Sequence, residues 1–448
     1  MFKLNTPLAI LVFFCINAYA KDYPVRSAAE LSFLNLKPGD RAIMQPGTWT
    51  NQQLVFKAKG TKEAPITLVS AEPGKVIISG NSSLLIDGEW LVVDGLNFTQ
   101  GGSQKKDIIT FSKESEWCRL TNTAIVDYNP ADKKQDYKWV SLNGYHNRVD
   151  HCRIKGKNHQ GTTLVVWVAD KPNYHQIDHN FFDTRPDLGN NGGETIRIGT
   201  STVSMNDSFT TVEDNIFYQC NGEMEVVSNK SGHNTIRNNL FYECVGTLTL
   251  REGNFADVYG NYIIGNGVKG TGGIRIIGES HKVHQNYLQG LTGTGLKAAI
   301  SVMDAIPNSE LKGYAQVKDA EIRNNTIINC AEAFEIGAGK RDGRDLPPQK
   351  IVIQNNMVLA STPIIYTDQP KKLKISGNIL YNIRLNTDLP DGFDMDDPRL
   401  AVDGTNTYQP QKRNKVGAPA ISQGQRQLFD GTGIGPAWYK NLPPIKVK

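Results

Sequence analysis

Four charged residues near the middle of the chain have the types and the spacing that proton-transfer chemistry requires. Glu223 and Glu225 occupy alternate positions, and Lys230 follows five residues after Glu225. Arg251 stands at nearly the same point of a second, similar segment. If the two segments are stacked strands, the four side chains share one exposed patch. A lysine can accept a proton and an arginine can stabilise developing negative charge, so we expect a site for an anionic ligand here.

The two glutamates also predict a cation. Glu223 and Glu225 would project from one strand side by side, and they would repel each other unless a cation or Lys230 neutralised them. Two carboxylates and the amide oxygen of Asn191, in the segment NNGGETIRIG, form a set of hard oxygen ligands that suits calcium. A metal ion or an arginine beside Lys230 would lower the pKa of this lysine and so favour the neutral amine that a base needs. A ladder of solvated ion pairs is the alternative interpretation.

A repeated segment of the chain must position these residues. TVEDNIFYQC, TIRNNLFYEC, DVYGNYIIGN and EIRNNTIINC each place an Asn after a short apolar and polar stretch and before further apolar residues. The aligned asparagines Asn215, Asn239, Asn261 and Asn286 are separated by 24, 22 and 25 residues. The series continues with Asn180, Asn325, Asn356 and Asn378.

Short strands that recur with this period, with no helices between them, are typical of an all-β, right-handed parallel β-helix. Asn tolerates the left-handed backbone of tight turns, and inward Asn amides can bond from coil to coil as a ladder. We therefore interpret the asparagines as scaffold. A leucine-rich repeat would need an LxxLxL pattern, and a propeller would need a period nearer forty residues.

A second column follows from the triplets IRI, MEV, LTL, IRI and FEI. Their outer members alternate into the core, which leaves the central residue of each on one outward face. The predicted outward column is Arg197, Glu225, Thr249, Arg275 and Glu335.

The chain is predicted to form one domain between two terminal segments. Residues 1–20 have a positive start, the apolar run LAILVFFCI and the small-residue end AYA, which is typical of a secretory signal peptide and not of a membrane span. Residues 21–383 would form the β-helix, with a short helix in VRSAAELSFLNL capping its open end. Residues 384–448 are rich in Pro and Gly and are expected to be an irregular cap packed on the helix. The location would be secreted or periplasmic.

Composition excludes some functions. The formal charge of +4 is too small to indicate a nucleic-acid partner. The cysteines after residue 20 are odd in number, and they lack the CxxC spacing of a zinc site. The five, which do not indicate a disulfide framework although export would permit a bridge, are Cys118, Cys152, Cys220, Cys244 and Cys330. Cys220, Cys244 and Cys330 each follow a repeated Asn by five residues, and we expect these three to be small buried hydrophobic residues.

The segments GEMEVVSNKS, RNNLFYECVGTLTLREGN and GTGGIRIIGE resemble polysaccharide lyase family six, which contains alginate lyases and the dermatan-cleaving chondroitinase B. The resemblance runs from KPGDRAIMQPGTW through most of the repeats, and its SNKS and TLTLR motifs are specific. The family fold is a parallel β-helix, in agreement with the repeat. TLTLRxGN and SNKS are more similar to the alginate branch.

The resemblance implies a role for each candidate residue. Lys230 would be the catalytic base and Arg251 its partner at the leaving oxygen. Calcium would be held by Asn191, Glu223 and Glu225, with Glu194 as a further metal-site residue. Arg275 would bind the substrate carboxylate and Arg197 would also contact substrate. Glu252 would be a further substrate-binding residue, and because the family often has His at this position, we expect it to affect which sugar is preferred.

These residue types suit β-elimination from a uronate. The base removes the C5 proton, and the glycosidic oxygen at C4 leaves. Calcium or an arginine neutralises the carboxylate on which a second negative charge accumulates. Because a guanidinium keeps its proton, Arg251 is expected to stabilise the leaving alkoxide while water or a tyrosine completes the transfer.

Three alternatives to an alginate lyase remain open from the sequence. The first is a lyase acting on dermatan sulfate, and the second is a non-catalytic β-helix that binds acidic glycans. The third is a hydrolase of the pectinase kind, although that would need clustered aspartates. The insertions MDAIPNSELKGYAQ and GKRDGRDLPPQ are predicted to be loops that border the binding groove. The oligomeric state, the block preference and endo or exo cleavage are not determined.

Overall fold

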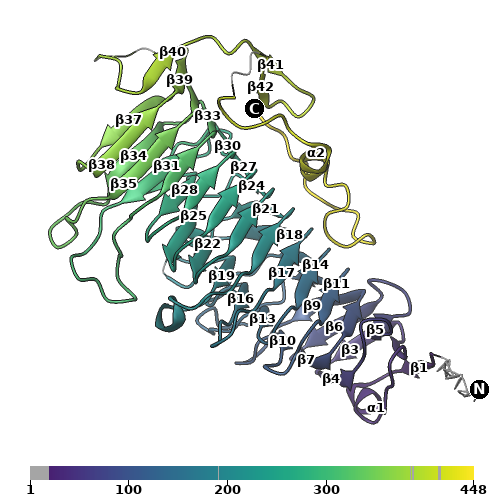
Figure 1. Ribbon diagram of the computed structural model, residues 1–448. Helices are drawn as coiled ribbons and strands as arrows, with labels where there is room; N and C mark the ends of the chain where they lie inside the picture. Colours follow the sequence, from purple (N-terminus) through teal and green to yellow (C-terminus); the bar gives the residue numbers. More distant parts are fainter. Residues whose placement is uncertain (1–19, 190, 384, 386–387, 412–414) are drawn as a thin grey trace, which may run out of the picture.

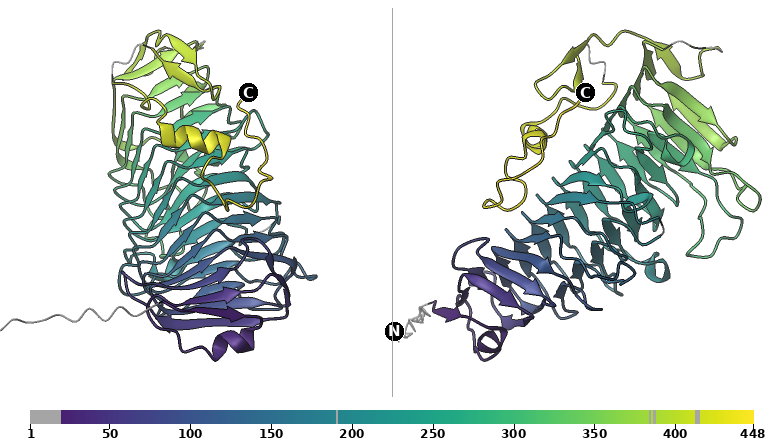
Figure 2. Two further views of the ribbon diagram at one scale, coloured as in Figure 1. Left: turned by 90° about the vertical axis from the view of Figure 1, so that its right-hand side faces the viewer. Right: turned by 180° about the vertical axis from the view of Figure 1, so that it is seen from behind.

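The computed structural model describes residues 20–189, 191–383, 385, 388–411 and 415–448. These residues form three long parallel sheets, and the chain passes through all three in turn before it starts the next coil (Figures 1 and 2). The predicted all-β parallel β-helix is thereby confirmed. The predicted signal peptide lies outside the described residues, apart from its last residue, Ala20. No helix in the described ranges is long and apolar enough to cross a membrane.

The strands of the three sheets are numbered in chain order. Sheet A consists of β1 (Asp22–Val25), β2 (Arg41–Met44), β5 (Ile66–Ser70), β8 (Leu91–Asp94), β11 (Arg119–Thr121), β14 (Arg148–Asp150), β17 (Gln176–Asp178), β20 (Thr211–Glu213), β23 (Thr235–Arg237), β26 (Asp257–Tyr259), β29 (Lys282–His284), β32 (Glu321–Arg323), β35 (Gln349–Gln354) and β38 (Lys371–Ser376). Sheet B consists of β3 (Gly47–Thr50), β6 (Val76–Gly80), β9 (Leu96–Gly101), β12 (Ala124–Val126), β15 (Arg153–Lys155), β18 (Phe181–Arg185), β21 (Ile216–Cys220), β24 (Leu240–Tyr242), β27 (Tyr262–Ile264), β30 (Tyr287–Gln289), β33 (Thr326–Ile328), β36 (Met357–Leu359), β39 (Asn378–Tyr381) and β40 (Phe393–Met395). Sheet C consists of β4 (Gln53–Lys59), β7 (Ser83–Glu89), β10 (Ile109–Phe111), β13 (Val140–Leu142), β16 (Leu164–Val166), β19 (Ile196–Ile198), β22 (Glu225–Lys230), β25 (Thr247–Glu252), β28 (Ile274–Ile276), β31 (Ile300–Met303), β34 (Glu332–Ala338) and β37 (Thr362–Tyr366).

The core runs along the axis of the helix. In β28 the side chains of Ile274 and Ile276 are fully buried, because alternate strand residues point inward and meet the equivalent residues of the next coil. Each such burial contributes about 1.5–3 kcal/mol. The five cysteines of the described chain are buried and free of disulfides, which confirms the predicted burial of Cys220, Cys244 and Cys330.

The asparagine ladder lies at the turn from sheet A to sheet B. The backbone N–H and the Nδ2 of Asn239 both donate to Oδ1 of Asn261, at 3.0 Å each, and Asn261 repeats both bonds with Asn286. The ladder extends from Asn180 to Asn378. The left-handed backbone that we expected of these asparagines belongs instead to the residue before each one, such as Asn238 with a φ of 53°.

The N-terminal end of the β-helix is covered by the short α-helix α1 (Ala28–Ser32), as predicted (Figure 1). Ser27 begins the helix because its side chain accepts a hydrogen bond of 3.1 Å from the backbone of Glu30. This helix contacts β4 and shields the first coil.

The described part of residues 384–448 contains regular elements. After β40 come the antiparallel strands β41 (Leu400–Val402) and β42 (Tyr408–Pro410), and then the helix α2 (Gln423–Asp430). Figure 2 shows this segment running back along the side of the β-helix instead of stopping at its last coil. The Trp438 indole donates to the carbonyl of Asn122 at 2.8 Å, and the Tyr242 hydroxyl donates to the carbonyl of Lys446 at 3.0 Å.

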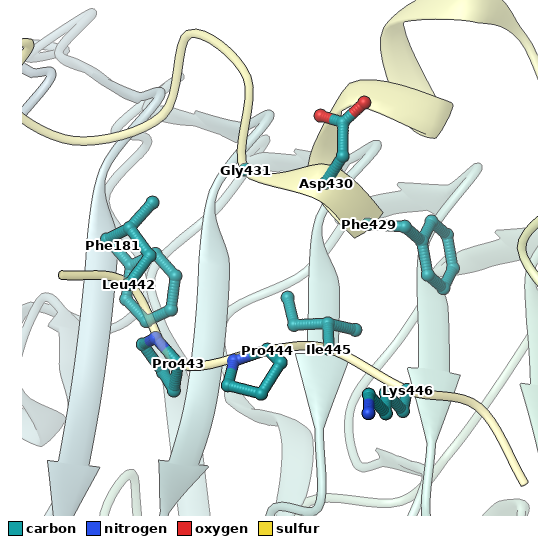
Figure 3. Close-up of a pocket in the computed structure, with 9 residues that line it drawn as sticks. All are labelled: Phe181, Phe429, Asp430, Gly431, Leu442, Pro443, Pro444, Ile445 and Lys446. Carbon is teal, nitrogen blue, oxygen red and sulfur yellow. The ribbon is translucent and has the colours of Figure 1, made fainter. Parts of the chain in front are cut away.

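A cavity of about 280 Å³ remains where the C-terminal segment crosses sheet B. Phe181, Phe429 and the stretch from Leu442 to Lys446 line it (Figure 3). Because the candidate residues Lys230 and Arg251 lie on sheet C, this cavity is separate from the candidate site.

The ladder predicts a test of stability. Replacing Asn261 with Ala would leave the backbone N–H and amide of Asn239 and the carbonyl of Ile236 without these partners inside the protein. We expect the free energy of unfolding to fall by about 2–5 kcal/mol, measured by urea denaturation. Asn35→Ala is the control, because Asn35 is exposed and its side chain contacts Lys37. Equal free energies of unfolding for the two variants would show that the ladder does not stabilise the fold.

Candidate active site

Lys230 and Arg251 lie on neighbouring strands of sheet C. Lys230 ends β22, and Arg251 is the second-last residue of β25. Asn229 pairs with Leu250 and Lys230 pairs with Glu252, so Arg251 is an extra residue in a β-bulge. A bulge re-aims a side chain, so the direction of Arg251 does not follow the alternation of its strand and depends on the contacts of its guanidinium.

The outward column of sheet C differs from the predicted one at β22 and gains one member at β31. Arg197 pairs with Ser228, Ser228 with Thr249, and Thr249 with Arg275. Ser301 and Glu335 continue the column. The prediction that Glu225 belongs to this column is wrong, because a register shift separates it from the paired residues of β22.

The reason for the error is a buried polar residue. Asn229 occupies an inward position that the triplet pattern reserved for an apolar side chain, and it is fully buried. Its Oδ1 accepts a hydrogen bond of 2.8 Å from Asn234, and its Nδ2 donates to the carbonyl of Ser231 at 3.0 Å. These partners satisfy the buried amide and fix the strand end that carries Lys230.

Glu194 and Glu223 come from equivalent turns of two neighbouring coils. The turns touch backbone to backbone: a Cβ on Gly193 would lie 2.1 Å from the carbonyl oxygen of Gly222. Only glycine allows this approach. Burial raises the pKa of Glu223 to about 8, and repulsion by Glu194 and Glu225 adds to the rise, whereas Lys230 opposes it. The Glu223 Oε1 is buried without a hydrogen-bond partner.

Glu225 is neutralised by arginine. Its Oε1 accepts a short hydrogen bond from Arg275 and lies 3.7 Å from Nε of Arg251. Its Oε2 accepts a hydrogen bond of 2.5 Å from Ser228. The sequence assigned this neutralisation to a cation or to Lys230, and the structure assigns it to two arginines from the following coils.

The predicted metal-site residues Glu194 and Asn191 differ in burial and in their hydrogen-bond partners. Glu194 is buried, and its Oε2 accepts a hydrogen bond of 3.0 Å from Thr162. Asn191 is exposed, and its backbone carbonyl accepts a bond of 2.5 Å from Gln160. Within the described ranges, no group of three or more His, Cys, Asp or Glu side chains is arranged to hold an ion. The unpartnered oxygen and raised pKa of Glu223 nevertheless fit a cation, and the donor set is of the oxygen type that calcium takes.

Arg251 is held by a loop that sequence reasoning did not connect with it. Its Nη1 donates to the carbonyl of Gly313 at 2.5 Å, and its Nη2 donates to the carbonyl of Lys312 at 3.1 Å. The guanidinium lies 4.3 Å from the ring centre of Tyr314. The loop is the insertion MDAIPNSELKGYAQ, predicted to border the groove. No motif within it identified Tyr314.

Glu252 lies between the two catalytic candidates. It pairs with Lys230 in the sheet, and its Oε1 is 3.5 Å from Nη1 of Arg251 and accepts a bond of 2.9 Å from Ser201. Burial raises the pKa of Glu252, and Lys230 opposes the rise. Glu252 is 5% exposed and lies against both candidates, so it can tune the charge of Lys230 and Arg251.

Arg197 lies one coil before Ser228 and faces an aromatic ring. Its guanidinium is 5.6 Å from the ring centre of Trp167, whose indole donates to Ser141 at 3.1 Å. The sequence analysis missed Trp167, although a tryptophan that directly follows the apolar run of a strand is a usable signal.

The comparisons with known proteins cover nearly all of the chain. The family model for chondroitinase B matches residues 25–418. The solved structure of AlyGC, an alginate lyase of polysaccharide lyase family six, is 37% identical with a TM-score of 0.88. That match covers 94% of this chain and 59% of AlyGC, so this chain spans about three fifths of the length of AlyGC. No curated protein matches the chain.

Two shorter relatives match along almost their whole length. A mannuronic acid-specific family six lyase from the human gut microbiota is 30% identical, with a TM-score of 0.81 and coverage of 94% of this chain and 97% of that one. The family six lyase Pedsa3628 from Pseudopedobacter saltans is 27% identical, with a TM-score of 0.76 and coverage of 93% and 100%. The chain therefore belongs to polysaccharide lyase family six, nearer to its alginate lyases.

Proposed function

We propose that this protein is an exported lyase that cleaves alginate by β-elimination. The observation that carries the proposal is the placement of Lys230 and Arg251 on adjacent strands of sheet C, with Arg197 and Arg275 in the flanking coils. This row of cations suits a polymer that carries one carboxylate on each sugar. Two relatives named as acting on alginate or on mannuronic acid support the choice of substrate.

In the proposed reaction Lys230, in its neutral form, takes the proton from C5 of a uronate. The C5–H electron pair forms the double bond between C4 and C5, and the bond from C4 to the glycosidic oxygen breaks. Arg251 donates a hydrogen bond to that oxygen while negative charge develops on it. The leaving oxygen finally takes a proton from water or from a tyrosine, since a guanidinium does not release its own.

The remaining charged residues stabilise the intermediate. Arg275 would turn part of its guanidinium from Glu225 towards the uronate carboxylate. Asn191, Glu223 and Glu225 would hold calcium, with Glu194 beside them, and the ion would supply positive charge that neutralises that carboxylate. Arg197 would hold the carboxylate of a neighbouring sugar beside Trp167.

Dermatan sulfate is the second candidate substrate, because the family model that matches is described as chondroitinase B. Its uronate permits the same proton abstraction by Lys230. Residues 1–20 would direct the protein to the periplasm or out of the cell, where either polymer would be met.

If Lys230 is the catalytic base, replacing it alone should remove most of the activity. With alginate, the wild type is expected to produce the ultraviolet absorbance of unsaturated uronate, and Lys230→Ala to reduce kcat by about 10³-fold or more. Lys282→Ala is the control, because Lys282 is exposed on sheet A. Activity of Lys230→Ala near that of the control would remove the lysine from the mechanism.

The same assay separates the candidate functions. Absorbance with dermatan sulfate and none with alginate would select the second substrate. Binding of both polymers without any absorbance would indicate a glycan-binding β-helix that is not an enzyme.

If calcium binds at this site, the protein should be more stable with calcium than with a chelator. If calcium binds only the folded chain and its free concentration is one hundred times the Kd, the free energy of unfolding should rise by about 2.7 kcal/mol. Thermal unfolding with calcium and with a chelator measures this rise in the wild type and in Glu223→Gln. We expect Glu223→Gln to lose most of the effect, because the variant removes the unpartnered carboxylate.

Glu321→Gln is the matched control, since Glu321 lies on sheet A and contacts Arg323. A chelator that leaves both activity and unfolding of the wild type unchanged would rule out a resident calcium ion.

A further inference from the structure

Two insertions from the far end of sheet C return towards the catalytic candidates. One follows β31 and the other follows β34, at the green end of the helix in Figure 1. Ala305 and Leu346 form an antiparallel bridge between them, with hydrogen bonds of 2.9 and 3.1 Å. The backbone N–H of Ile306 donates to the carbonyl of Tyr314 at 3.0 Å and closes the first loop on itself. The two insertions therefore hold each other in place.

Tyr314 receives two cations on its ring. The guanidinium carbon of Arg251 lies 4.3 Å from the ring centre, and that of Arg344, from the second insertion, lies 3.6 Å from it. Arg344 is only 5% exposed, and its Nε has no hydrogen-bond partner. A cation over the face of a tyrosine ring is attracted by the negative charge density of that face, and the attraction is stronger when water is excluded. The ring thus attracts both guanidinium groups and offsets part of the repulsion between them.

Arg251 needs such support because it lies outside the regular pairing of the sheet, where Glu225 and Glu252 approach its nitrogens only to 3.7 and 3.5 Å. It is the extra residue of a bulge, and a free arginine side chain samples many rotamers. In the structure its side chain is 12% exposed and is fixed by the loop carbonyls of Lys312 and Gly313 together with the Tyr314 ring. Those carbonyls take two of the five N–H donors, so donors remain for a ligand.

We propose that Tyr314 is a positioning residue for Arg251, holding its guanidinium at the leaving oxygen before the polymer binds. The inference rests on the proposed lyase function and adds a residue that acts through Arg251 with its ring. The hydroxyl is not required for this role, because the contact is made by the face of the ring.

The first test compares two substitutions of one side chain. Tyr314→Phe keeps the ring, and Tyr314→Leu removes it. On the polymer that the wild type cleaves, we expect Tyr314→Leu to lower kcat about 10- to 100-fold with KM within about twofold, and Tyr314→Phe to stay within about threefold of wild type. Tyr366→Leu is the matched control, because Tyr366 is 38% exposed on β37 of the same sheet.

A second test asks whether Tyr314 acts through Arg251. In an Arg251→Ala background, adding Tyr314→Leu should cause no further loss of kcat, because the group that is positioned has already gone. A full additional loss in the double variant would overturn the inference. Loss of kcat in Tyr314→Phe equal to that in Tyr314→Leu would also overturn it, since the hydroxyl would then be the active group.

A third measurement does not depend on cleavage. Amide hydrogen exchange of residues 305–316 should be faster in Tyr314→Leu than in wild type and unchanged in Tyr314→Phe, because the ring anchors the loop to Arg251. Equal exchange in all three proteins would contradict the anchoring. If the wild type cleaves no polymer but the three proteins show the expected differences in exchange, the lyase proposal is rejected and the anchoring of the loop by Tyr314 is retained.

Discussion

Hydrogen bonding from coil to coil is the constraint on which the rest of the structure depends. It sets neighbouring strands about 4.8 Å apart and fixes their register, so that residues more than twenty positions apart in sequence become direct neighbours. The buried asparagines from Asn180 to Asn378 reinforce this stacking at one corner, where each amide bonds to the next. Lys230 and Arg251 meet only because their two coils are stacked in this register.

Charge balance is the second constraint, because buried charges are tolerated only with partners. Glu225 meets this condition through Arg275 and Arg251. Glu223 does not, since Glu194 repels it and one of its oxygens has no partner. Gly193 and Gly222 allow the two turns to approach this closely, and a carboxyl group with so perturbed a pKa is more typical of a ligand site than of a scaffold.

At the centre of sheet C, the β-helix holds one catalytic candidate in place and a loop holds the other. The strand end at Lys230 is fixed from inside the helix by the satisfied amide of Asn229. Arg251 leaves the sheet at a bulge and is fixed from outside by the loop of Tyr314. Insertions between coils can thus change the surroundings of one catalytic candidate without disturbing the other, because the core beneath them stays the same.

The sequence by itself determined the β-helix, since the spacing of Asn215, Asn239 and Asn261 repeats the length of one coil. Motif resemblance also gave the candidate residues, although their roles stay predictions. Only the tertiary structure placed Ser228 in the outward column and removed Glu225 from it, because the alternating pattern cannot foresee an inward polar residue whose partners come from a neighbouring turn. Only the structure joined Tyr314 to Arg251, since contacts made by loops over sixty residues away follow from folding and leave no periodic signal.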